Sequence, residues 1–150
     1  MFKNFERKFR RDDLGSAAPS RTDNLPATKG LRDFFVKLGG ASYSGGVYRT
    51  VHSTEVDMWN QRIWGAFPQY ASVTLCFGYD WLGSVFAIDF GRSVDGEPGV
   101  LMFEPGTGEV LEIPASIITF HDEELLDLEF SEAALIRSFF EKWVHSGGAI

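Results

Sequence analysis

One cysteine and three histidines are the residues of this chain best suited to nucleophilic and acid–base chemistry. Cys76 together with His52 or His121 would form a thiol–imidazole pair, in which the base activates the nucleophile. Cys76, however, lies within the apolar run VTLCFG, and free cysteine is among the residue types that are most often buried. The pattern therefore favours a core position for Cys76 over a catalytic one.

A second cluster places His121 next to three acids, Asp122, Glu123 and Glu124. These groups could bind a metal ion or transfer protons. Adjacent side chains on a helix point in different directions, however, and the spacing does not match HExxH. Acids in a first helical turn complement the helix dipole. We therefore expect this cluster to mark the start of a helix, and its acids to be available for contact with a protein partner.

Asp80 and Asp89 are a third possibility, because paired carboxylates can act as the acid and base of a glycosidase. They stand at the two ends of an expected strand, where a rise of about 3.3 Å per residue keeps them far apart. We expect Asp80 to cap the turn that begins at Trp81. An exposed tryptophan can anchor an interface, so Asp80 and Trp81 are predicted to bind a partner.

Composition bounds the class of protein. The 150 residues, 44% of them hydrophobic, suit one domain, and a single cysteine excludes an internal disulfide. No apolar run approaches the roughly 18 residues of a membrane span, and residues 1–11 lack the apolar stretch of a signal peptide. We therefore expect a cytoplasmic protein without a membrane partner. The net charge of −7 disfavours direct nucleic-acid binding, because phosphate affinity comes from Lys and Arg.

No recognisable motif points to a cofactor. The glycines at 106 and 108 lie in an expected hairpin loop and lack the spacing of a phosphate-binding loop. No nucleophile, base and orienting group come together in the sequence. The sequence accordingly predicts no catalytic residue, no cofactor and no metal site, and hence a protein that is not an enzyme. A small enzyme remains the least favoured alternative.

Charge is unevenly distributed along the chain. Residues 1–32 hold eight Lys/Arg and four Asp/Glu, a net of +4, and the remainder holds six and seventeen, a net of −11. Eleven acids and no Lys or Arg lie between Arg92 and Arg137. This interval is either a solvated face that aids solubility or a surface that steers a basic partner. In the second case the candidates are the acids of an expected hairpin loop and helix start: Glu104, Glu109, Asp122, Glu123 and Glu124.

The periodicity of apolar residues indicates alternating helices and short strands. Helices are predicted over 2–11, 31–38, 53 or 54 to about 66, 116 or 119 to 128, and 131 to about 146. Strands are predicted over 41–44, 47–51, 72–79, 84–90, 100–103 and 110–113. Between them we expect a Gly45-Gly46 turn, a polar excursion at 91–99 that carries the turn signal Asp95-Gly96, and a six-residue loop at 104–109. This order predicts one α+β domain, a mainly antiparallel sheet flanked by helices. Residues 1–30 would be a basic helix and an irregular connection packed on the domain formed by 31–150.

Side chains alternate across a strand, so the apolar residues of the sheet cannot all face one side. We therefore expect helices over most of both faces, or over one face with loops on the other. The residues expected to supply much of the sheet are Phe77, Val85, Phe86, Ile88, Leu101, Phe103, Leu111 and Ile113.

From residue 39 to residue 148 the sequence resembles a bacterial immunity-protein family. The residues that carry the resemblance are Gly39-Gly40, Gly46 to Arg49, Phe67-Pro68, FGYDWLGSVFAIDFGR at 77–92, VLMFEPGTGEVLEIP at 100–114, Phe120-His121 with Glu124-Leu125, and Phe139 to Trp143. The pattern is similar to the C-terminal domain of type VI secretion immunity proteins that follows a GAD-like region, and to the broader SUKH superfamily of Smi–Knr-type proteins. The resemblance implies a SUKH-like fold and a non-enzymatic protein that binds and neutralises a cognate toxin, such as a nuclease with a basic cleft. A SUKH-like scaffold or regulatory binding module is the alternative.

Overall fold

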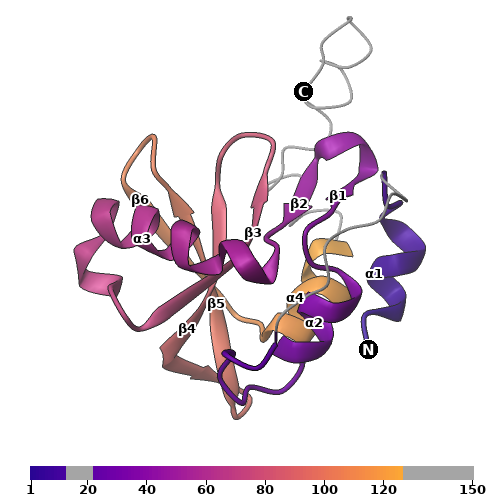
Figure 1. Ribbon diagram of the computed structural model, residues 1–150, viewed down its shortest axis with the longest axis horizontal. Coiled ribbons are helices and arrows are strands. Elements are labelled where there is room, and N and C mark those ends of the chain that lie inside the picture. Colours follow the sequence, from indigo (N-terminus) through magenta and orange to yellow (C-terminus); the bar gives the residue numbers. More distant parts are fainter. Residues whose placement is uncertain (13–21, 127–150) are drawn as a thin grey trace, which may run out of the picture.

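Each strand of the sheet pairs with its neighbour in the sequence. The computed structural model describes residues 1–12 and 22–126 (Figure 1). It holds one six-stranded antiparallel sheet of order β1-β2-β3-β4-β5-β6. The strands are β1 (Ser42–Tyr43), β2 (Tyr48–Thr50), β3 (Thr74–Asp80), β4 (Val85–Val94), β5 (Glu97–Glu104) and β6 (Glu109–Ile113). The α-helices of the described residues are α1 (Lys3–Lys8), α2 (Leu31–Lys37), α3 (Val56–Ala66) and α4 (Ile117–Asp122).

Helices cover both faces of this sheet, which confirms the predicted α+β domain. Figure 1 shows α3 across one face, with α1, α2 and α4 grouped together beside the β1–β2 end. Alternation along the strands divides the core accordingly. Phe77, Phe86 and Ile88 pack in the larger cluster with the apolar residues of α1, α2 and α4. Cys76, Val85, Ala87, Leu101 and Phe103 form the smaller cluster with Ile63 of α3 and with Phe67.

The helical periodicity of apolar residues predicted both helices of the first forty residues, α1 and α2. Every apolar residue on which those two helices were predicted is buried: Phe2, Phe5, Phe9, Leu31, Phe34, Phe35 and Leu38. The eight residues expected in the sheet all lie in strands, but Leu111 is exposed. It is exposed because β6 is an edge strand, which pairs with β5 alone among the described strands.

Most residues of the predicted polar excursion at 91–99 lie in strands, but the turn predicted there at Asp95-Gly96 is confirmed. Strand β4 continues to Val94 and β5 begins at Glu97, so most of these residues form a hairpin around Asp95-Gly96. Both turn residues have positive φ, 51° and 83°, as a tight two-residue turn requires. The register shifts between Asp89 and Ser93, so a bulge separates the buried half of β4 from this polar half.

Three further boundaries differ from expectation. The loop between β5 and β6 has four residues rather than six, because Glu104 and Glu109 form the last pair of the ladder. Residues Ser44–Gly46 form a 3₁₀ turn rather than a two-residue hairpin turn. A 3₁₀ turn also precedes α3, and the His52 side chain accepts the Thr54 N–H there. The helix predicted at 131–146 lies outside the described residues.

Candidate protein-binding surface

Two turns of the sheet meet at one end of the molecule. Because β3 to β6 are antiparallel neighbours, the β3–β4 turn and the β5–β6 loop lie at the same end, the upper one in Figure 1. We call residues 80–84 and 104–109 the acidic tip. A shallow groove of about 200 Å³ runs between the two turns. Its lining residues are Leu82, Gly83, Ser84, Glu104, Pro105, Gly106 and Thr107.

Asp80 holds the first of these turns in shape. Its Oδ1 accepts the backbone N–H groups of Leu82 (3.0 Å) and Ser84 (2.9 Å), as predicted for a turn cap. The residue is only 2% exposed. Burial raises the pKa of Asp80 from 3.8 to about 6, against the two backbone hydrogen bonds, which lower it. Its Oδ2 is buried and accepts no hydrogen bond. The structure therefore places Asp80 beneath the surface, where it positions the turn residues.

The apolar group that projects from the turn is Leu82, which is 48% exposed. Trp81 is partly buried and packs against the larger core cluster, and its backbone N–H donates to the Val47 carbonyl at 3.3 Å. The sequence pattern predicted Trp81 as a partner-binding residue, and Leu82 was not predicted. The available signal was position: a large aliphatic side chain between Trp81 and Gly83, inside a tight turn, has no strand register that would bury it.

Glu104 and Glu109 face each other across the last pair of β5 and β6. Glu109 is exposed and Glu104 is half-buried, and within the described part of the chain neither forms an ion pair. Thr107 Oγ1 donates to Glu104 Oε2 at 3.3 Å, which ties that carboxylate to the loop. Like charges directly opposite each other in a sheet are destabilising. A cation placed between them by a partner would remove that repulsion.

No cation of the four long strands offsets this charge. Residues 74–113 contain seven acids and a single Lys or Arg, Arg92. Arg92 lies at the far end of the sheet, in the bulged part of β4. The negative charge of the acidic tip is therefore not neutralised by a Lys or Arg of strands β3–β6.

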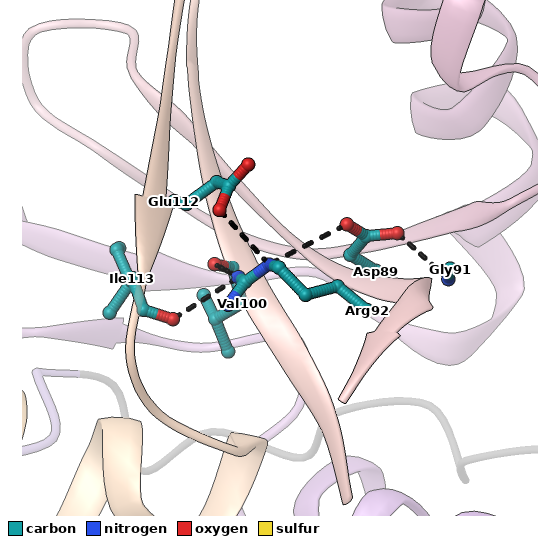
Figure 2. Close-up of polar contacts among 6 residues, drawn as sticks. All are labelled: Asp89, Gly91, Arg92, Val100, Glu112 and Ile113. Carbon is teal, nitrogen blue, oxygen red and sulfur yellow. Dashed lines mark hydrogen bonds and ion pairs between the residues drawn. The ribbon is translucent and has the colours of Figure 1, made fainter. Parts of the chain in front are cut away.

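Figure 2 shows how Arg92 is engaged. Its guanidinium lies over Gly99, where a Cβ would come within 2.7 Å of it. Arg92 Nη2 donates to the carbonyls of Val100 (2.6 Å) and Ile113 (3.2 Å), and Nε lies 3.8 Å from Asp89 and 3.7 Å from Glu112. Asp89 is thus committed to Arg92 and, through its Oδ1, to the Gly91 N–H at 2.9 Å. It lies at the opposite end of β3 and β4 from Asp80.

The acids after His121 belong to another surface and do not begin an α-helix, whereas the start predicted at Ser116 is confirmed. Helix α4 begins with a capping box between Ser116 and Thr119 and ends at Asp122. Asp122 Oδ2 accepts the Phe2 N–H (3.0 Å) and Oδ1 accepts the Phe5 N–H (3.2 Å). Asp122 therefore caps the N-terminus of α1 from 117–120 residues away, which satisfies free amides and complements the helix dipole.

Glu123 follows α4 and is exposed, whereas Glu124 begins a 3₁₀ turn over Glu124–Leu126 and is half-buried. Both lie beside α1, whose exposed face is basic. The structure thus groups four of the predicted partner-binding residues, Asp80, Trp81, Glu104 and Glu109, at the acidic tip, and places the other three next to a basic helix.

His121 is a core residue, fully enclosed among the phenylalanines of the larger cluster. Its Nδ1 lies 2.8 Å from the Ile117 carbonyl and its Nε2 lies 2.8 Å from Tyr48 Oη. A carbonyl can only accept, so Nδ1 carries the proton and Nε2 accepts the Tyr48 O–H. Burial lowers the pKa of His121 to about 3, so the imidazole is neutral at pH 7.

Cys76 is fully buried, which confirms the predicted core position. Burial raises the pKa of the Cys76 thiol to about 12, so the nucleophilic thiolate is scarcely populated at neutral pH. In the described ranges no three His, Cys, Asp or Glu side chains are grouped as metal ligands would be. No helix there is long and apolar enough to cross a membrane.

Comparison with known proteins adds no relative: no protein-family model, no curated protein and no solved structure matches this chain. The class of protein is therefore argued from the acidic tip and from the sequence pattern.

Proposed function

We propose that this protein is a non-enzymatic immunity protein that binds a bacterial toxin through the acidic tip and neutralises it. The observation that carries the proposal is the convergence of Glu104, Glu109 and the exposed Leu82 at one end of strands β3–β6, whose only Lys or Arg, Arg92, is engaged at the other end. The resemblance of the sequence to type VI secretion immunity proteins and to the SUKH superfamily supplies the biological setting. In this setting the protein acts in the cytoplasm.

The acidic tip supports a partner protein with a basic surface, such as a nuclease cleft. Opposite charges accelerate encounter, and this steering weakens with salt over a Debye length of about 8 Å at physiological ionic strength. Leu82 would add apolar contact to the interface, since it is exposed and lines the groove together with Glu104. Steering by the rim acids and burial of Leu82 would act on the association rate and on the dissociation rate respectively.

The test is affinity capture from the source strain with two baits, followed by mass spectrometry. The wild-type protein should enrich a basic protein that the Glu104→Lys/Glu109→Lys variant does not retain. Asp23→Lys/Asp33→Lys is the matched control, because it changes the net charge equally at exposed positions outside the tip. Purified partner should then associate with the tip variant at least about ten-fold more slowly at low salt, with a flatter salt dependence.

Growth assays separate the two candidate functions. Expression of the captured partner should arrest growth, and co-expression of the wild-type protein should restore it. A captured partner that is harmless when expressed alone would instead favour a scaffold or regulatory module. Equal capture and equal association rates with both double variants would overturn the acidic tip as the docking surface.

A further inference from the structure

A second concave surface lies at the opposite end of β3 from the acidic tip. It is a half-open groove of about 450 Å³ between the first two turns of α3, the start of β3, and residues 24–26. This volume falls within the range of ligand-binding pockets. Strand β3 spans seven residues, so roughly 20 Å of strand separates the groove from the tip.

Asn60, a largely buried residue of this groove, has one side-chain donor without a hydrogen-bond partner among the described residues. Asn60 is 7% exposed, and its Oδ1 accepts the Cys76 N–H at 2.8 Å. That bond fixes the amide so that Nδ2 is the end left for the groove, which Asn60 lines. Within the described residues Nδ2 donates no hydrogen bond, and it is not among the fully enclosed atoms. A donor that opens into the groove without a protein partner can bond to a ligand that brings an acceptor.

The groove lining is half polar, and its apolar part is held in place. Val56 and Leu75 form buried apolar lining, and Phe90 is 40% exposed at the rim. Trp64 is oriented by its Nε1–H, which donates to Thr74 Oγ1 at 2.9 Å. Thr74 Oγ1 in turn donates to the Tyr70 carbonyl at 3.1 Å. These hydrogen bonds fix the orientation of the Trp64 ring before any ligand binds.

Charge decides the class of ligand. None of the lining residues is Lys, Arg or His, and exposed Asp57 lies one helical turn from Asn60. A carboxylate or phosphate ligand would meet Asp57 without a compensating cation. The acceptor for Asn60 is therefore a neutral carbonyl, and Asp57 suits an ammonium or guanidinium group.

We propose that this groove binds a short extended peptide segment of a partner protein, with an apolar side chain on the Leu75 wall and a neighbouring lysine or arginine at Asp57. A peptide brings a neutral carbonyl, an apolar side chain and a cation at adjacent positions, which is the combination that the groove presents. The site is separate from the acidic tip and does not depend on the identity of the toxin.

The test uses the full-length ¹⁵N-labelled protein and two matched peptides, acetyl-Ala-Leu-Lys-Ala-amide and acetyl-Ala-Leu-Glu-Ala-amide. The lysine peptide should shift the Asn60 side-chain amide and the Trp64 indole resonances in a saturable way, and should bind about five-fold or more tightly than the glutamate peptide. Acetyl-leucine-amide is the small-molecule arm. Equal affinity for that compound would overturn the peptide assignment.

Variants locate the binding. Asp57→Asn should reduce the preference for lysine over glutamate to less than about two-fold. Asn60→Asp keeps an acceptor for the Cys76 N–H but removes the donor, and should weaken the lysine peptide about ten-fold. Phe90→Ser should also weaken it, whereas Leu82→Ser at the acidic tip should not. Should Asn60→Asp fail to fold, Asp57→Asn and Phe90→Ser decide the question. An absence of shifts with either peptide, or shifts unchanged in these variants, would overturn the proposal.

Discussion

Replacing Asp80 by asparagine tests whether a buried, ionised carboxylate in the acidic tip lowers the free energy of unfolding. The structure buries Asp80 and leaves its Oδ2 without a hydrogen bond, and the pKa rises from 3.8 to about 6. A difference of about 2.2 pKa units corresponds to about 3 kcal/mol. We therefore expect ionised Asp80 to destabilise the fold by a free energy of this order at neutral pH.

The sign follows from linkage. The folded pKa of Asp80 lies above the unfolded value, so folding favours the protonated carboxyl. The benefit of a neutral Asp80 is complete below about pH 3.8 and is lost as the pH rises through about 6. Asparagine does not ionise and retains an Oδ1 acceptor for the turn. The free energy of unfolding of Asp80→Asn minus that of the wild type should therefore increase by about 2–3 kcal/mol between pH 4 and pH 8, with most of the change below about pH 6.

Urea unfolding at pH 4, 5, 6, 7 and 8 measures this difference. The asparagine Nδ2 adds an offset of its own, but that offset does not vary with pH, so only the slope matters. Glu123→Gln, at an exposed position, corrects for the general effect of removing one negative charge. A flat difference, or one that falls as the pH rises, would refute the assignment of Asp80 as a buried and uncompensated carboxylate.

Three other substitutions test the roles assigned to buried and capping residues. Cys76→Ala should cost about 1–2 kcal/mol of stability in urea unfolding, and should leave protection in the growth assay intact; a folded variant without protection would contradict a purely structural thiol. His121→Ala opens a cavity and leaves the Tyr48 hydroxyl without its acceptor, so it should cost about 3–5 kcal/mol; a loss below about 1 kcal/mol would contradict the buried pair. Asp122→Ala should cost about 1–2 kcal/mol and accelerate amide hydrogen exchange at Phe5, whereas Asp122→Asn, which keeps one acceptor, should lose less; unchanged exchange in both would contradict the cap.

The periodicity of apolar residues predicted an element correctly where all of its apolar side chains face one core. Leu31, Phe34 and Phe35 predicted α2 because all three face the same core. The hairpin beyond Asp89 was missed because its polar residues extend past the helices that cover the sheet, so no apolar alternation marks it. Its stability comes instead from Arg92, which reaches across to β5 and β6, and a contact of that kind leaves no local signal.

At the candidate surface, too, roles set by neighbouring residues were predicted and roles set by distant residues were not. The turn-capping role of Asp80 depends on residues two and four positions away, and it was predicted correctly. Asp122 was placed at the wrong end of a helix because its partners lie in α1, at the other end of the chain. The adjoining His121 reads as a polar surface residue until the fold encloses it with Tyr48 and the phenylalanines. Roles set by long-range packing could not be read from spacing alone.

The bond between Asp122 and the start of α1 also has a consequence for biosynthesis. The first helix emerges from the ribosome with three phenylalanines that are buried in the finished protein, but its capping carboxylate is translated 120 residues after Phe2. At about 5–20 residues per second, this delay is roughly 6–24 s. During that time α1 is a basic amphipathic segment without its cap. The meander of neighbouring strands can assemble in the order of translation, and Phe5 can then pack on Tyr43 and Tyr48, but the capping of α1 must wait until the end of α4 has been made.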